Sequence, residues 1–265
     1  CSSDLGFYRL DTADTPFAIS DDFRQVMRAA FMIAEWTEGA WDPTVQPLVD
    51  AWGFGPKGPS TSPSAEQIAA VMKRVGLNQI ELSSDSKLVK RDPAVTLDLA
   101  TIAKGHGDDV VARELRAQGH DSFLVEIGGE VYAAGRRLDG QPWRIGLEQP
   151  VSRASGPRFH QVIELESQAL ATSGDYRNFR VESGARRHHI IDPRTGMPVS
   201  THVASVSILA PDCRTADALA TAVMVLGRDD GLSLIERVDG VHGVILTRGP
   251  DGSEQRHASS GFPSE

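Results

Sequence analysis

Apolar residues recur every three or four positions between residues 21 and 38, which predicts a helix with Ser20 as its cap. A second helix is predicted after Ser64, where a capping box begins, and Gly76 is expected to end it. Prolines and glycines crowd the stretch between these helices, so we expect a long loop around residues 52–62.

Short alternating runs of apolar and polar residues predict strands along much of the remaining chain. These runs lie within residues 79–99 and at 123–127, 130–134, 143–147, 161–165, 204–209 and 243–247. Further helices are predicted over residues 103–118, 215–226 and 230–238, and the polar tail from Gly249 is expected to fray. Strands and helices do not alternate regularly, so we expect an α+β fold with mixed or antiparallel sheets and flanking helices.

Composition narrows the class of protein. The chain has 265 residues, enough for one or two domains, and 27 basic against 36 acidic residues give a net charge of -9. No basic stripe offers a nucleic-acid surface, and no apolar run approaches the roughly 20 residues that span a bilayer. Two cysteines, Cys1 and Cys213, exclude a disulfide framework and a tetrahedral zinc site. Cys1 is either the lipid-bearing first residue of a mature lipoprotein or simply the residue at which this sequence starts.

A candidate anion site lies in LDLATIAKGHG, residues 97–107. An apolar run ends near Asp98, and a helix is expected to open at Lys104. Exposed amides at a helix start attract anions, and the lysine adds a full positive charge. The alternative, a plain surface lysine at a helix start, fits these residues equally well.

A candidate metal site lies in TADALATAVMVLG, residues 215–227. Asp217 and Thr221 are four residues apart, so both oxygens lie on one helix face. An ionised carboxylate among alanines and valines is costly unless it is paired or binds a cation, and oxygen ligands suit Mg²⁺. The alternative is a first-turn aspartate stabilised by the helix dipole.

A candidate base lies in RRHHIIDPRTGMP, residues 186–198. His188 and His189 are expected to alternate across a strand, so only one of them faces a given cleft. A structural role is the more common one for such a pair. Gly128-Gly129 and the Ser173-Gly174-Asp175 turn are places where a backbone can approach a ligand closely, although hairpins often contain such turns.

Six motifs in this order resemble the FAD:protein FMN transferases, the ApbE-like flavinyl transferases. They are GAWDPTVQPLVDAWGFG at 39–55, LDLATIAKG, VEIGGE, ATSGDYRNF, HIIDPRTGMP and ADALATAVMVLG, and the similarity covers about residues 20–247. The resemblance implies a single domain of this family over residues 1–265, with a T-fold-like architecture.

The resemblance also implies an activity: Mg-dependent transfer of FMN from FAD to a Thr or Ser hydroxyl of an acceptor flavoprotein, with release of AMP. It implies His189 as the catalytic base. Magnesium ligands would be Asp217, Thr221 and the main-chain oxygen of Thr101, with the oxygen of Ala220 as a further candidate. The FAD contacts that it implies are Ala40, Trp41, Asp42, Asp98, Lys104, Gly128, Gly129, Ser173, Asp175 and Ile190.

Three departures from the family pattern stand out. Trp41 occupies a position where Phe is usual, and His106 replaces a common Tyr. The family normally has roughly fifty residues before residue 1 of this sequence, including a strand that touches the flavin. The alternatives to transfer are an FAD pyrophosphatase and a non-catalytic flavin-binding protein. Family analogy further suggests a periplasmic or inner-membrane-attached location facing the periplasm, and respiratory flavoproteins as acceptors.

Overall fold

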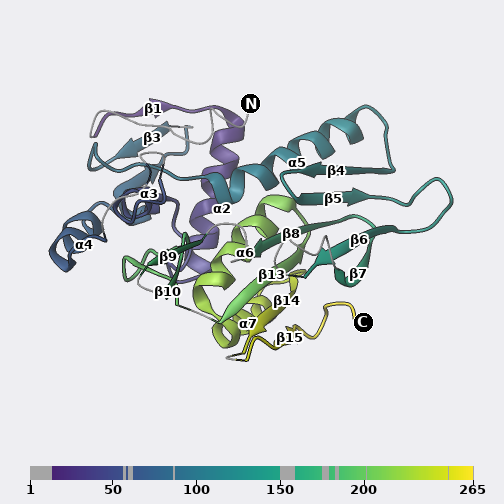
Figure 1. Cartoon of the computed structure of the whole chain (residues 1–265). Helices are drawn as coiled ribbons and strands as arrows, with labels where there is room; N and C mark the ends of the chain where they lie inside the picture. The colour runs from purple at the N-terminus through teal and green to yellow at the C-terminus, as the bar shows by residue number, and fades with distance from the viewer. Residues whose placement is uncertain are drawn as a thin grey trace. The chain divides into compact units, whose positions relative to one another are not determined.

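The computed structural model describes residues 14–55, 58, 62–85, 87–149, 159–174, 179–182, 185–200, 202–249 and 251–264. The chain divides into two compact units (Figure 1). Unit 1 comprises residues 1–103 and 180–200, and unit 2 comprises residues 104–179 and 201–265. The division falls inside helix α5 (Ala100–Ala117).

Unit 1 begins with the predicted helix, α2 (Asp21–Trp36), whose cap Ser20 accepts a hydrogen bond from the amide of Phe23. The predicted capping box at Ser64 is also present and starts α4 (Ala65–Met72). Ile68 of α4 forms a small core with Leu48, Trp52 and Ile191. The remaining helical segments of this unit are η1 (Pro43–Val45), α3 (Gln46–Ala51) and η2 (Leu77–Gln79).

The strands of unit 1 are short. Its three-stranded sheet has the order β1-β3-β2 and is antiparallel. Two further antiparallel strands flank the Asp192–Gly196 turn, where the carboxylate of Asp192 accepts a hydrogen bond from the Arg194 amide. These strands are β1 (Phe17–Ala18), β2 (Ile80–Leu82), β3 (Lys87–Lys90), β11 (Ile191–Asp192) and β12 (Met197–Pro198). A separate pair joins β9 (Phe179–Glu182) to β10 (Ala185–His188).

Unit 2 is built on a six-stranded antiparallel sheet with the order β15-β14-β13-β8-β5-β4. Every residue of the central strand β13 is buried, as expected for a strand that is covered on both faces. The strands are β4 (Phe123–Ile127), β5 (Glu130–Ala134), β8 (Gln168–Gly174), β13 (Val203–Ala210), β14 (His242–Arg248) and β15 (Glu254–Ala258).

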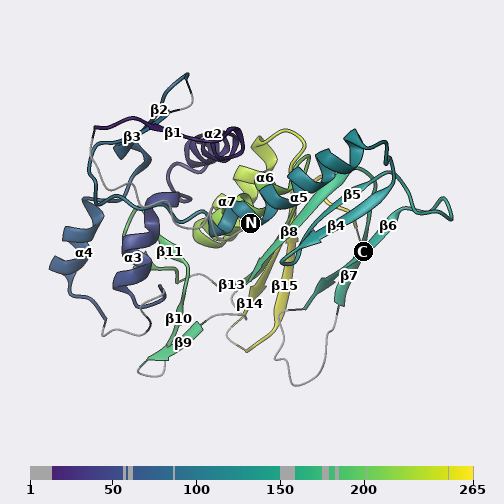
Figure 2. The same ribbon diagram turned by 90° about the horizontal axis from the view of Figure 1, so that it is seen from above.

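Different layers cover the two faces of this sheet (Figure 2). Helix α6 (Cys213–Leu226) packs on β8 and β13, and α7 (Arg228–Arg237) packs on α6 and β14. On the other face, β6 (Trp143–Glu148) and β7 (Phe159–Leu165) pair with each other and contribute Leu147, Ile163 and Leu165 to a core with sheet residues such as Leu170. The sheet therefore holds α6, with its candidate metal ligands, on a rigid support.

The predicted α+β class is confirmed. Helix α3, which precedes the loop expected around residues 52–62, was not predicted, and three local expectations are wrong. Residues 94–99 form no strand. Helix α4 ends at Met72 rather than at Gly76. The tail beyond Gly249 is not frayed, because β15 pairs with β14. In the described part of the chain, no helix combines the length and apolar character needed to cross a membrane.

Candidate functional site

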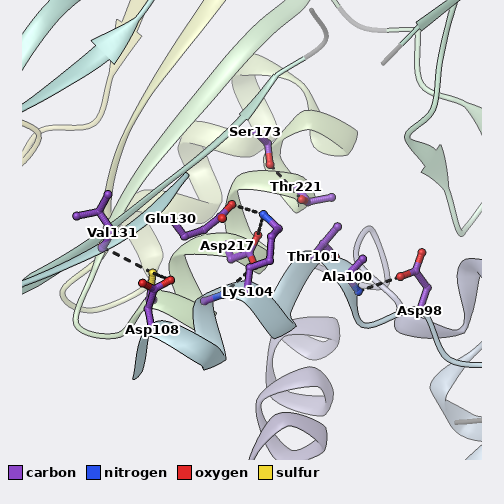
Figure 3. A network of polar contacts seen from close by, with 12 residues as sticks. Asp98, Ala100, Thr101, Lys104, Asp108, Glu130, Val131, Ser173, Asp217 and Thr221 are labelled. Carbon is purple, nitrogen blue, oxygen red and sulfur yellow. Dashed lines mark hydrogen bonds and ion pairs between the residues drawn. The ribbon is translucent and has the colours of Figure 1, made fainter. Parts of the chain in front are cut away.

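Lys104 lies between two buried carboxylates in unit 2 (Figure 3). Its ammonium group forms an ion pair with Oε1 of Glu130 and lies 3.6 Å from Oδ1 of Asp217. The side chains of Glu130 and Asp217 are each 4% exposed, whereas that of Lys104 is 39% exposed. With both carboxylates ionised, one cation against two anions leaves an excess negative charge in a place from which water is largely excluded.

Backbone geometry allows this close arrangement. Gly128 has a φ of +68°, and a Cβ atom there would lie 3.0 Å from Cδ of Lys104. A Cβ atom on Gly105 would lie 2.3 Å from the carbonyl oxygen of Cys213, so α5 approaches the start of α6 more closely than any larger residue would permit. Both glycines therefore bring Lys104 within reach of its partners.

Asp217 has few donors for a buried carboxylate. Its Oδ2 accepts a hydrogen bond of 3.2 Å from the amide of Gly105. Burial raises the pKa of Asp217 to about 7, the charge of Lys104 opposes that rise, and the charge of Glu130 adds to it. The group therefore has capacity for a cation that would replace its proton.

One turn further along α6, Thr221 presents its hydroxyl to β8. Its Oγ1 lies 3.1 Å from Oγ of Ser173, and both side chains are half-buried. Ala220, beside it, is fully buried. Unit 2 thus brings together four predicted site residues from the elements α5, β8 and α6, namely Lys104, Ser173, Asp217 and Thr221.

A second buried acid, Asp108, lies on α5 one turn beyond Lys104. Its Oδ2 is 3.7 Å from Sγ of Cys213, and its Oδ1 has no hydrogen-bond partner among the described residues. Burial raises the pKa of Asp108 to about 8, with a further contribution from the charge of Glu130. Burial and these carboxylates also raise the pKa of the Cys213 thiol, so this cysteine is not a reactive thiolate.

In unit 1, Asp98 organises the start of α5. Its Oδ1 accepts a 2.9 Å hydrogen bond from the amide of Ala100, and its own amide donates to the carbonyl of Pro43 at 2.6 Å. Burial raises the pKa of this carboxyl. The aspartate predicted to contact FAD thus has a structural role at the helix start as well.

Thr101 interrupts the regular geometry of α5. Its backbone angles are φ −96° and ψ 18°, outside the helical values. The indole Nε1 of Trp41 donates a 3.0 Å hydrogen bond to its hydroxyl oxygen. Trp41 and its neighbour Ala40 are 3% and 1% exposed, so this turn of unit 1 is well packed.

Asp42 is held by several donors. Its Oδ1 accepts from the amide and the hydroxyl of Thr44 at 2.8 and 2.6 Å, and its Oδ2 accepts from the amide of Leu77 at 3.1 Å. Thr44 in turn accepts a 2.6 Å hydrogen bond from the amide of Gly76. This carboxylate joins the turn after α2 to the segment after α4.

The expected alternation of His188 and His189 along one strand is wrong. Strand β10 ends at His188, and His189 lies in the bend that follows it, half-buried. Ile190, next in the chain, is 9% exposed, and its carbonyl accepts a 3.0 Å hydrogen bond from the amide of Val199. The side chain of His188 and the whole of Asp175 lie outside the described residues.

Sequence reasoning gave Glu130 no binding role, although it is the partner of Lys104. A signal was present: an acid at the first position of a buried strand, directly after two glycines, needs a cationic partner. Gly128 and Gly129 are exposed at this point. Among the described residues, no group of three or more histidine, cysteine, aspartate or glutamate side chains is arranged to hold a metal ion.

Comparisons with known proteins find matches over nearly the whole chain. The model of the ApbE family matches residues 2–245. The FAD:protein FMN transferase of Vibrio cholerae is 41% identical over 262 residues, which are 98% of this chain and 77% of that protein. The protein of the same name from Haemophilus influenzae is 42% identical over 241 residues, 89% of this chain and 69% of the relative.

Solved structures give the same result. The flavin transferase ApbE from Vibrio cholerae superposes with a TM-score of 0.85 at 40% identity, over 96% of this chain and 80% of that one. The apo form of the flavinyl transferase ApbE from Pseudomonas stutzeri has a TM-score of 0.83 at 36% identity, over 94% and 76% of the two chains.

Proposed function

The chain belongs to the ApbE family, and from this membership we propose that it transfers the FMN part of FAD to a hydroxyl group of an acceptor protein. The comparisons confirm the prediction that it is an enzyme of the flavin-transferring kind. The observation that carries the proposal is the position of Lys104, a half-exposed cation between the buried Glu130 and Asp217.

In the proposed reaction, the acceptor hydroxyl of a Thr or Ser attacks the FMN phosphorus of FAD. A new phosphoester bond forms between the acceptor oxygen and this phosphorus. The pyrophosphate bond breaks, AMP departs with the bridging oxygen, and the proton of the hydroxyl passes to a base. Positioning and electrostatic stabilisation account for most catalysis of phosphoryl transfer.

The residues of α6 fit a magnesium ion. Asp217 offers a carboxylate with one amide donor and a lysine at 3.6 Å, and Thr221 offers a hydroxyl one turn away. Oxygen donors of this kind suit a small, hard cation that keeps some of its water. When bound, Mg²⁺ would supply positive charge that stabilises the phosphate oxygens and the departing AMP. The main-chain oxygen of Thr101 and that of Ala220 remain the further ligands that the resemblance implies.

Lys104 would hold a phosphate oxygen of FAD. Its side chain is 39% exposed, so it can reach a ligand. The ion pair with the buried Glu130 orients the ammonium group. A lysine acts on phosphate as a point charge. The ion pair with Glu130 holds the Lys104 side chain in place before FAD binds, which lowers the cost of binding. Loss of Lys104 should therefore weaken FAD binding more than it changes the magnesium dependence.

His189 would take the proton from the acceptor hydroxyl. A hydroxyl is a weak nucleophile near neutral pH, and a positioned base contributes about 10²–10⁴-fold in rate. His189 lies in a bend and is half-buried. We expect His189→Ala to slow transfer by about this factor while FAD and Mg²⁺ still bind.

The test is incubation of the protein with FAD and Mg²⁺, with and without an acceptor protein whose target Thr or Ser hydroxyl is still free of flavin. Release of AMP together with covalent flavin on the acceptor supports transfer. Release of AMP and free FMN at the same rate without acceptor would mean an FAD pyrophosphatase instead. Binding of FAD without release of AMP in either mixture would mean a flavin-binding protein. His189→Ala, run beside the wild type, tests the base within the same assay.

A further inference from the structure

Trp41 and Thr101 are sixty residues apart in the sequence and are joined by a side-chain hydrogen bond of 3.0 Å. The donor is the indole N–H, and the acceptor is the threonine hydroxyl oxygen. Phenylalanine, which is usual at this position in the family pattern, could fill the same space but has no N–H to donate. The contact therefore depends on the indole N–H of Trp41.

The indole is firmly supported. Trp41 is 3% exposed, and its amide donates a 3.2 Å hydrogen bond to the hydroxyl of Thr37, the residue that ends α2. Glu38 and Gly39 both have positive φ angles, 52° and 77°, which turn the chain sharply between these two residues. A side chain held in this way can impose a position on its partner.

Thr101 is the residue whose backbone leaves the helical conformation inside α5. The carbonyl of Leu99 accepts hydrogen bonds from both Ile102 and Ala103, at 3.1 and 2.8 Å, so the helix starts with a tightened turn. In a regular helix the carbonyl of Thr101 would accept from the amide of Gly105. That amide donates to Asp217 Oδ2 at 3.2 Å.

These observations concern the same carbonyl group. The backbone of Thr101 is rotated away from helical geometry, and the amide that would normally compete for its oxygen has a second acceptor. Residues in the sparsely populated region around φ −90° and ψ 0° persist only where their surroundings hold them, and such residues are frequent at ligand sites. The hydrogen bond from Trp41 to the Thr101 hydroxyl is a side-chain contact that restrains this residue.

We propose that Trp41 is a positioning residue: its indole N–H holds Thr101 in the conformation that leaves the main-chain oxygen of Thr101 available as a ligand for a divalent cation. This rests on the proposed function, in which that oxygen binds Mg²⁺. Trp41 acts through Thr101 and does not itself bind the cation. With this hydrogen bond, the protein binds Mg²⁺ more tightly than it would with the same ligands and no hydrogen bond from Trp41.

The test compares single hydrogen-bond deletions in the full chain. Trp41→Phe removes the donor, and Thr101→Val removes the acceptor while keeping the main-chain oxygen. Each is titrated with Mg²⁺ in the absence of FAD, and the shift of the thermal unfolding midpoint gives the dissociation constant for the ion. We expect each substitution to weaken Mg²⁺ binding about fivefold, the factor that corresponds to an ordinary hydrogen bond. The double variant should be no weaker than either single one, because both remove the same contact.

Trp52→Phe is the matched control. Trp52 is also buried in unit 1, and its indole N–H donates to the carbonyl of Gly196 at 2.8 Å. Its loss should lower the unfolding midpoint without changing the affinity for Mg²⁺, since the indole N–H of Trp52 donates to Gly196 and not to Thr101. Thr101→Ser, which keeps the hydroxyl, should bind Mg²⁺ more tightly than Thr101→Val.

Two outcomes would count against the proposal in different ways. Equal Mg²⁺ affinity in wild type and Trp41→Phe, or equal losses in Trp41→Phe and Trp52→Phe, would overturn the positioning role and leave the proposed transfer intact. No Mg²⁺-dependent shift in the wild type, together with transfer that survives a chelator, would instead overturn the metal assignment on which the role rests.

Discussion

Asp42 in unit 1 and Asp217 in unit 2 are both largely buried aspartates, but their surroundings differ. Three donors from Thr44 and Leu77 satisfy both oxygens of Asp42. Asp217 has one amide at 3.2 Å and an ammonium group at 3.6 Å. Burial raises the pKa of each, but hydrogen bonds from Thr44 and Leu77 counter the rise at Asp42. A fully satisfied carboxylate joins segments of the fold, whereas an under-satisfied one keeps capacity for a ligand.

The largest expected effect follows from removing the under-satisfied group. Asp217→Ala should lower magnesium-dependent turnover by about 10³-fold, a loss typical of deleting a principal electrostatic group in an active site. The fold should persist, because alanine suits the interior of α6 and removes a costly buried charge. Release of AMP from FAD measures turnover, and circular dichroism measures folding.

Asp217→Asn sharpens this result, since it keeps the shape of the side chain but removes the negative charge. We expect it to lose nearly as much turnover as the alanine variant. A folded Asp217→Ala protein that still releases AMP at the wild-type rate would show that Asp217 has no part in the site.

The second effect should be a loss of stability, in contrast to the loss of turnover expected for Asp217→Ala. Asp42→Ala should destabilise the protein by about 2 kcal/mol, because the amides of Thr44 and Leu77 lose a buried acceptor. Chemical unfolding measures this. Asp251→Ala is the control: Asp251 holds Ser253 in a similar turn but is exposed, so its loss should change stability by less than about 0.5 kcal/mol. Equal losses from both substitutions would contradict the structural role assigned to Asp42.

The smallest effect concerns Asp108, which lacks a partner for one oxygen and has a pKa raised to about 8 by burial. An unfolded aspartate ionises near pH 4, so between about pH 4 and pH 8 the unfolded state binds fewer protons at this position than the folded state. The free energy of unfolding should therefore fall as pH rises through this window. Asp108→Asn should make the fall smaller, as measured by urea unfolding at several pH values. An unchanged slope would mean that Asp108 is ionised in the folded protein.

The sequence predicted correctly those helices and strands that are determined by residues close together in the chain. Strands β4 and β5 have the bounds that their alternating residues indicate, because Gly128 and Gly129 allow the tight connection between them. The capping box at Ser64 placed the start of α4. The family, too, is confirmed, since its motifs are short runs that can be read one at a time.

The features that the sequence did not predict depend on contacts between residues far apart in the chain. Residues 94–99 alternate like a strand, but the amide of Asp98 donates to the carbonyl of Pro43, and within the described part of the chain these residues pair with no strand. β15 consists of the polar residues EQRHA and is a strand only because β14 offers it an edge. The contact between Lys104 and Glu130 spans 26 residues, so the sequence contained both residues of the pair but not their proximity.

The strand β15 has a practical consequence for handling the protein. It covers the backbone of β14, whose residues Val244, Ile245 and Leu246 are buried. An uncovered strand of this apolar kind is a template for pairing with other chains, whereas a short polar strand makes a poor one. A protein shortened before Glu254 would expose that template, and aggregation during expression would follow from the lost edge rather than from damage to the site. Affinity tags are therefore better attached beyond residue 264 than substituted for the last strand.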